Sequence, residues 1–142
     1  LPIDIDITEK KVLLVEDSED NREIFKYFLK SMKLYVDTAE NGEIAITKLI
    51  QSDYDFILMD IQLPIIDGLE ATRMIRSMGY LKPIIALTAH ASFEAKMSCL
   101  KAGCTGIITK PVTQTSLLQN ILFILEDKKL DGITNDITKL HT

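Results

Sequence analysis

The sequence predicts an α/β domain built on a doubly wound sheet of five parallel strands, and three observations carry this prediction. Five short runs of four or five residues, most of them apolar, recur along the chain and are too short to be buried helices. Segments with helical periodicity separate these runs, so consecutive strands are joined by crossovers and lie parallel. Polar residues end four of the runs, which places them at one edge of the sheet.

The first strand is Lys11–Val15, and we interpret residues 1–10 before it as a linker. Residues 3–7 alternate strictly between apolar and acidic, which fits either an edge strand or an extended linker. After the strand, Ser18 is a suitable N-cap for a helix. The apolar positions of that helix, which ends near Met32, recur at helical spacing: 24, 25, 28, 29 and 32.

The second strand is predicted over Leu34–Thr38. Asn41 and the glycine after it mark a turn into a helix that continues through Leu49. The third strand, Phe56–Met59, has no polar alternation and therefore reads as a strand covered on both faces. Asp60 follows it directly, so an apolar run ends abruptly in a carboxylate.

The remaining elements alternate in the same way. A helix is predicted over Leu69–Met78, a fourth strand over Ile84–Leu87, a helix from about Ser92 to Ala102, and a fifth strand over Thr105–Thr109. The last helix is indicated by apolar residues at positions 117, 118, 121, 122 and 125. The domain therefore extends over residues 11–126.

Residues 127–142 form a polar tail with a weak apolar stripe. Its apolar residues are spaced three, four and three apart, at Leu130, Ile133, Ile137 and Leu140. Gly132 lowers helix stability, and we interpret the tail as a frayed appendage rather than a partner-facing helix.

The composition excludes several classes of protein. The 142 residues are 46% apolar and 26% charged, as in a soluble globular domain. The sequence has no uninterrupted run of about 18 apolar residues, which argues against a membrane span. The net charge of −5, without a basic stripe, argues against nucleic-acid binding. Cys99 and Cys104 lack zinc-site spacing and are read as reduced thiols. We expect a cytoplasmic domain without membrane contact.

Five polar residues converge at the carboxyl ends of four strands: Glu16, Asp17, Asp60, Thr88 and Lys110. Each alone has an ordinary interpretation as a helix entry, a cap or a solvated charge, but all five fall at strand ends. Three carboxylates in one partly buried site require a cation, and hard oxygen ligands suit Mg²⁺ or Mn²⁺. With the metal, Lys110 and Thr88 would hold a phosphoryl group against Asp60, whose carboxylate oxygen would be the nucleophile.

Four blocks of sequence, VLLVEDSEDN, LMDIQLPIIDG, ALTAHA and TKP, resemble in order and spacing the receiver domains of two-component response regulators and hybrid histidine kinases. The resemblance covers residues 11–126. It implies a flavodoxin-like (βα)5 fold with strand order 2-1-3-4-5. It also implies a domain that phosphorylates and dephosphorylates itself rather than an independent enzyme.

The resemblance assigns roles to individual residues. Asp60 would be the phosphoacceptor. The Mg²⁺ ligands would be three carboxylates and one backbone carbonyl: Glu16, Asp17, Asp60 and Gln62. The phosphoryl oxygens would be bound by two side chains and by loop amides: Thr88, Lys110, Ile61 and Ala89. The Lys110-Pro111 peptide would be cis.

The resemblance also implies partners. The phosphoryl donor would be a phosphohistidine on a histidine kinase or a histidine phosphotransfer protein, and phosphorylation would change the conformation, with a phosphorylation-dependent dimer as one outcome. We interpret the chain as the receiver part of a hybrid histidine kinase, because it begins at Leu1 rather than Met and carries no output domain. A stand-alone single-domain response regulator is the alternative.

Two details, which involve three residues, depart from the commonest pattern of the family. Ile107 stands three residues before Lys110, where many receivers carry an aromatic residue that rotates on activation. Gln62 and His90 occupy positions that tune the access of water to the acyl phosphate.

Three other functions compete with phosphorelay signalling. A haloacid dehalogenase type phosphatase also uses an aspartate at a strand end, but needs a second aspartate where this chain has Gln62. A flavodoxin needs a loop rich in Ser, Thr and Gly after the first strand, where this chain is acidic. A degenerate receiver that only docks would lack some of the five polar residues.

Overall fold

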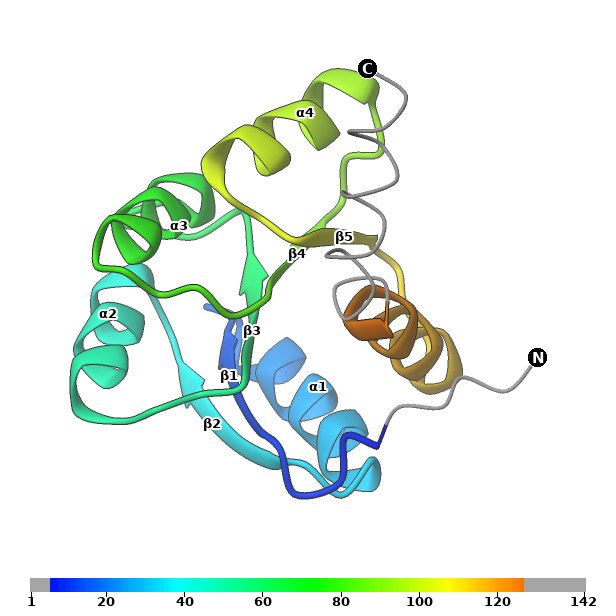
Figure 1. Ribbon diagram of the computed structural model, residues 1–142. Coiled ribbons are helices and arrows are strands. Elements are labelled where there is room, and N and C mark those ends of the chain that lie inside the picture. The colour runs from blue at the N-terminus through cyan, green and yellow to red at the C-terminus, as the bar shows by residue number, and fades with distance from the viewer. Residues whose placement is uncertain (1–5, 127–142) are drawn as a thin grey trace, which may run out of the picture.

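The computed structural model describes residues 6–126 and contains one parallel sheet of five strands (Figure 1). The strands lie in the order β2-β1-β3-β4-β5, which confirms the predicted doubly wound topology. Each strand pairs in parallel with its neighbours. Their bounds are β1 Lys11–Val15, β2 Tyr35–Ala39, β3 Phe56–Asp60, β4 Ile84–Thr88 and β5 Gly106–Thr109.

Helices follow the strands and cover both faces of the sheet. Their bounds are α1 Glu19–Ser31, α2 Gly42–Gln51, α3 Gly68–Ser77 and α4 Phe93–Ala102. A C-terminal helix extends over residues 114–126, where the described part of the chain ends. The four labelled helices begin at side chains that accept a hydrogen bond from the backbone N–H three residues later, which are Ser18, Asn41, Asp67 and Ser92. These caps fix where each loop at the carboxyl edge ends.

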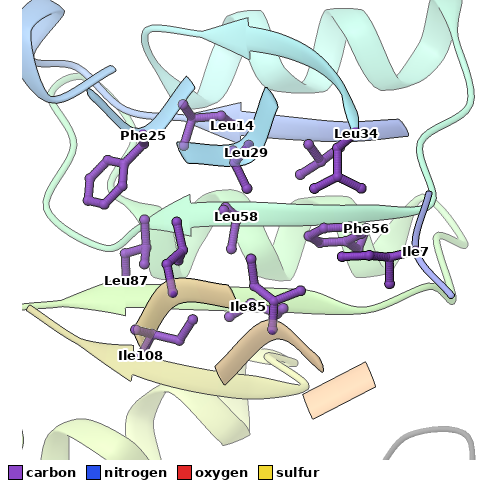
Figure 2. Close-up of a cluster of buried hydrophobic side chains, with 13 residues drawn as sticks. Ile7, Leu14, Phe25, Leu29, Leu34, Phe56, Leu58, Ile85, Leu87 and Ile108 are labelled. Carbon is purple, nitrogen blue, oxygen red and sulfur yellow. The ribbon is translucent and has the colours of Figure 1, made fainter. Parts of the chain in front are cut away.

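The sheet separates two apolar layers, because alternate residues of a strand point to opposite faces. Along β1, Leu14 belongs to one layer and Leu13 to the other. The first layer packs against α1 and the C-terminal helix, and Figure 2 shows its side chains, among them Phe25, Leu58 and Ile85. The second layer packs against α2, α3 and α4. Every residue of β3 and β4 is buried, as expected of central strands in a parallel sheet.

The observed boundaries differ from the predicted ones by one residue at several places. Tyr35 rather than Leu34 begins β2, and the buried side chain of Leu34 packs into the first layer before the strand starts. Asp60 and Thr88 are the last residues of β3 and β4 rather than the residues that follow them. The ladder thus continues up to the polar side chains, which holds their backbone rigidly.

The segment before β1 is described from residue 6 onward. It forms a turn in which Lys10 N–H donates to Ile7 O at 3.0 Å, and the Ile7 side chain is buried in the first layer. Residues 1–5 and the tail at 127–142, with its predicted apolar stripe, lie outside the described residues. Within residues 6–126, no helix has the length and apolar character needed to cross a membrane.

Candidate functional site

Three carboxylates meet at the carboxyl edge of the sheet. β1 and β3 are neighbours, and the pairing of Val15 with Met59 brings the next residues, Glu16 and Asp60, side by side. Asp17 follows in the loop to α1. One carboxylate oxygen from each of Glu16, Asp17 and Asp60 lies within 4.8 Å of the others. The predicted convergence of these residues is therefore found.

Glu16 is the most enclosed of the three, with 1% of its surface exposed. Its Oε2 accepts a hydrogen bond from the Ser18 N–H at 3.1 Å, whereas its buried Oε1 accepts none. Burial raises the pKa of Glu16 to about 7; the Ser18 hydrogen bond opposes the rise, and the charge of Asp60 adds to it. A buried oxygen without a hydrogen bond, beside two further carboxylates, fits a hard divalent cation such as Mg²⁺.

Lys110 supplies the positive charge of this site. Its Nζ lies 3.3 Å from Asp60 Oδ2 and 3.5 Å from Glu16 Oε1. The Lys110 N–H donates to Thr88 O at 2.7 Å, so the end of β5 is fixed to the end of β4. The Lys110-Pro111 peptide is cis, as the resemblance implied.

Thr88 lies on the strand next to Asp60. The side chain is 3% exposed, and its Oγ1 accepts a hydrogen bond from the His90 N–H at 3.1 Å. Ala89 follows at the strand end and is exposed. The hydroxyl of Thr88 can still donate its proton to an anion placed at the edge of the sheet.

The backbone amides after Asp60 are arranged differently from the prediction. The Ile61 N–H donates to Leu87 O at 3.0 Å and so continues the ladder between β3 and β4. The Gln62 N–H instead donates to Asp60 Oδ1 at 3.0 Å. The amide that faces the carboxylate is therefore that of Gln62, because the Ile61 amide is already used by the sheet.

Two contacts of the site were not predicted from the sequence. Gln62 Nε2 and His90 Nε2 are 2.9 Å apart, which joins the loops after β3 and β4. Arg22 Nη1 donates to Glu16 O at 3.0 Å and to Asp17 O at 3.4 Å, so α1 holds the acidic loop in place. Arg22 lies six residues from Glu16, and its position one helical turn after the N-cap is the only signal in the sequence that points to this contact.

A family model described as the response regulator receiver domain matches residues 12–122, which is more than half of the chain. The chain belongs to this receiver domain family. Receiver domains take phosphoryl groups from histidine kinases or phosphotransfer partners in two-component signalling, and they bind Mg²⁺ at an acidic pocket. This membership decides against the haloacid dehalogenase and flavodoxin interpretations.

Relatives of this receiver domain include hybrid kinases and short regulators. The chain is 42% identical over 113 residues to the autoinducer 2 sensor kinase/phosphatase LuxQ of Vibrio vulnificus, covering 79% of this chain and 13% of that protein. It is 40% identical over 111 residues to the two-component response regulator ORR41 of Oryza sativa, covering 75% of this chain and 87% of that protein. The chain thus spans about an eighth of the first relative and most of the second.

Solved receiver structures have the same fold. The receiver domain of the sensor histidine kinase PA1611 from Pseudomonas aeruginosa, described with a magnesium ion in its active-site cleft, matches with a TM-score of 0.73 and 38% identity, covering 81% of this chain and 95% of that one. The chemotaxis protein CheY4 of Vibrio cholerae matches with a TM-score of 0.79 and 29% identity, covering 82% and 99%.

Proposed function

We propose that Asp60 is the phosphoacceptor of this receiver domain. A carboxylate oxygen of Asp60 attacks the phosphorus of a phosphohistidine on a histidine kinase or a histidine phosphotransfer protein. The O–P bond forms as the P–N bond breaks, and the imidazole leaves with the electron pair and takes a proton from solvent. Hydrolysis of the acyl phosphate returns the carboxylate and releases inorganic phosphate.

Groups around Asp60 bind the transferred phosphoryl group. The Lys110 ammonium, 3.3 Å from the Asp60 carboxylate, neutralises negative charge on the phosphoryl oxygens. The Thr88 hydroxyl donates to another oxygen. The amides of Gln62 and Ala89 supply further donors, and Gln62 takes this role in place of Ile61 because its N–H already faces Asp60.

A divalent cation would bind next to the carboxylate of Asp60. Glu16, Asp17 and Asp60, with the backbone carbonyl of Gln62, would hold Mg²⁺, and Mn²⁺ would fit the same oxygen ligands. A cation held by these residues would neutralise charge between the carboxylates and the incoming phosphoryl group. The contact of Arg22 with the carbonyls of Glu16 and Asp17 keeps these ligands in position.

The observation that carries the proposal is the contact of Lys110 Nζ with both Asp60 and Glu16 inside a cluster of three carboxylates. The test is the intact mass of the wild type and of Asp60→Asn after incubation with acetyl phosphate and Mg²⁺, repeated with the metal chelated. We expect one phosphoryl adduct that requires both Asp60 and the metal. An adduct of equal yield in Asp60→Asn would refute the assignment.

The wider context of the domain is also a proposal. We place the receiver at residues 11–126, with a linker before it and a tail at residues 127–142, in a cytoplasmic hybrid histidine kinase. Support comes from kinase relatives that match over only a small part of their length. A stand-alone regulator similar to ORR41 is the alternative. A dimer formed on phosphorylation would be detected by sedimentation of the acyl phosphate form.

A further inference from the structure

A polar pocket lies at the carboxyl end of β2, the edge strand of the sheet, which packs against both α1 and α2 (Figure 1). The pocket has a volume of about 250 Å³. Residues of α1, of α2 and of the end of β2 line it: Arg22, Thr38, Ala39, Glu40, Ile44 and Lys48. None of the six is a proposed ligand of the cation or of the phosphoryl group. The pocket is therefore a concave site separate from the proposed phosphoacceptor.

Lys48 is held in a fixed position at this pocket. Its Nζ lies 2.9 Å from Asp37 Oδ1 and also donates a hydrogen bond to Thr38 O. The second oxygen of Asp37 accepts a hydrogen bond from the Tyr54 hydroxyl at 2.6 Å, and the Tyr54 side chain is buried. The ammonium is thus anchored to the core through Asp37. Because its position is already fixed, little side-chain entropy is lost when a ligand binds to it.

Arg22 supplies a second positive charge, and within residues 6–126 it forms no ion pair with a carboxylate. Its Nη1 donates to the backbone carbonyls of Glu16 and Asp17, which are neutral acceptors. The donors on Nε and Nη2 have no hydrogen-bond partner among the same residues. These two nitrogens form the edge of a guanidinium that binds a carboxylate or a phosphate through two parallel hydrogen bonds. The half-buried Arg22 therefore offers donors that the fold does not use.

Glu40 restricts the class of ligand that this pocket can bind. Its exposed carboxylate lines the same pocket and repels a simple anion. A ligand with an anionic group for the two cations must therefore also donate a hydrogen bond to Glu40. Two cations favour a dianionic phosphate over a carboxylate of single charge, and hydroxyl groups are suitable donors. Ala39 and Ile44 form an apolar wall for the carbon skeleton, and the volume suits a small metabolite rather than a nucleotide.

We propose that the pocket at the end of β2 binds a small phosphate monoester that carries hydroxyl groups, such as a sugar phosphate. Its phosphate accepts hydrogen bonds from Arg22 and Lys48, and a hydroxyl donates to Glu40. The ligand is bound without covalent reaction. Binding at this pocket requires neither Asp60 nor a metal ion.

Arg22 couples this pocket to the acidic site, and this part of the inference rests on the proposed binding of Mg²⁺. The positive charge of Arg22 lies against the carbonyls of Glu16 and Asp17, where it opposes a cation held by their carboxylates. A bound phosphate neutralises that charge and leaves the Nη1 contacts in place. The ligand therefore raises the affinity for Mg²⁺, and Mg²⁺ raises the affinity for the ligand by the same factor.

The test is calorimetric titration of glycerol 3-phosphate into the metal-free protein, with inorganic phosphate as the probe that lacks a carbon skeleton with hydroxyl groups. Lys48→Gln and Arg22→Gln each remove one cation of the pocket. Lys30→Gln is the matched control, because it removes the same charge from an exposed lysine in the last turn of α1. Lys110→Gln tests whether the anion binds beside Asp60 instead. Thermal unfolding without ligand verifies that each variant is folded.

We expect Lys48→Gln and Arg22→Gln to weaken the binding of glycerol 3-phosphate about tenfold each, whereas Lys30→Gln and Lys110→Gln bind it as the wild type does. Glu40→Ala should strengthen the binding of inorganic phosphate roughly threefold but not that of glycerol 3-phosphate, because it removes both a repulsive charge and an acceptor. Failure of the folded wild type to bind either probe would overturn the proposal. Undiminished binding to Lys48→Gln would also overturn it, as would loss of binding in Lys110→Gln.

Titration of Mg²⁺ with and without saturating glycerol 3-phosphate tests the coupling. We expect the ligand to lower the Kd for Mg²⁺ about fivefold in the wild type and to have no effect in Lys48→Gln, which also corrects for Mg²⁺ complexed by free ligand. Binding of the ligand without any effect on Mg²⁺ would overturn the coupling through Arg22. Binding of the ligand to a protein that does not bind Mg²⁺ would support the pocket and refute the proposed cation site.

Discussion

Gln62 and His90 join the two loops beside Asp60, the proposed phosphoacceptor, through a contact of 2.9 Å between Nε2 atoms. Each residue lies two positions beyond a site residue, Asp60 or Thr88, and both side chains are exposed. The pair therefore stands where solvent approaches the carboxylate. From this position, we expect the pair to limit the access of water to an acyl phosphate on Asp60 and so to lengthen its lifetime.

We predict that Gln62→Ala and His90→Ala each speed hydrolysis of the acyl phosphate roughly three- to fivefold, because removing either partner opens a path for water. The double variant should be little faster than either single variant, since both lose the same contact. The measurement is loss of the phosphoryl adduct with time after removal of acetyl phosphate. Gln51→Ala, an exposed glutamine at the end of α2, is the control. Slower hydrolysis, or effects that add fully, would contradict the prediction.

The fold was largely predictable from the sequence, because four of the strands are apolar runs with clear ends and the helices begin at recognisable caps. The ends of the strands were less predictable. Asp60 and Thr88 were expected to follow β3 and β4 but are their last residues, since a polar residue can continue the hydrogen-bonded ladder of a sheet. Leu34 was placed in β2, although its burial comes from packing before the strand.

The sequence was sufficient to predict that the carboxylates and the lysine of the candidate site lie close together, because the topology of the sheet alone brings the ends of these strands to one edge. The fine hydrogen bonding was not. The use of the Ile61 amide by Leu87 O depends on the register between β3 and β4. The contact of Gln62 with His90 and that of Arg22 with Glu16 O depend on side-chain rotamers, which no spacing in the sequence determines.

Binding of Mg²⁺ should weaken as the pH falls. The folded protein holds the pKa of Glu16 at about 7, whereas the ordinary value is 4.5, so below pH 7 the cation must displace a proton. We expect the affinity at pH 6 to be about tenfold weaker than at pH 8. Calorimetry in two buffers of different ionisation enthalpy measures the proton released. An affinity independent of pH would contradict the raised pKa.

The raised pKa of Glu16 also contributes to the pH dependence of stability in the metal-free protein. Because the pKa of Glu16 is higher in the folded than in the unfolded protein, Glu16 contributes most to the free energy of unfolding below pH 4.5. This contribution is lost as the pH rises through about 7. Glu16→Gln should remove this component of the pH dependence. Thermal unfolding of both proteins between pH 5 and 8 without metal, followed by circular dichroism, provides the measurement.

Gly68→Ala should destabilise the domain by about 2–4 kcal/mol, because the new methyl group would lie 2.2 Å from Asp60 O and 2.6 Å from Ile61 Cα. Backbone atoms cannot move aside as a flexible side chain can, so the start of α3 must shift. Urea unfolding measures the loss. Gly79→Ala is the comparison, since nothing lies within 4 Å of its added methyl group and only its positive φ opposes the change. Equal and small losses would contradict the close approach.

Lys110→Ala should separate metal binding from phosphorylation. Lys110 Nζ lies 3.3 Å from Asp60 Oδ2, but the proposed cation ligands are carboxylate oxygens that the substitution leaves in place. We therefore expect Mg²⁺ affinity to change less than about threefold, whereas labelling by acetyl phosphate slows at least about tenfold, because the phosphoryl oxygens lose their cationic donor. Calorimetry and intact mass measure the two effects.

The control for this prediction is Lys101→Ala, which removes an exposed lysine of α4 and should leave both quantities unchanged. Lys110→Arg keeps the charge but not the compact ammonium, so its labelling rate should lie between those of Lys110→Ala and the wild type. If Lys110→Ala is labelled as fast as the wild type, Lys110 serves only to neutralise Glu16 and Asp60. In that event the variant should still lose stability without metal and regain it when Mg²⁺ is added, because only an uncompensated cluster of carboxylates remains.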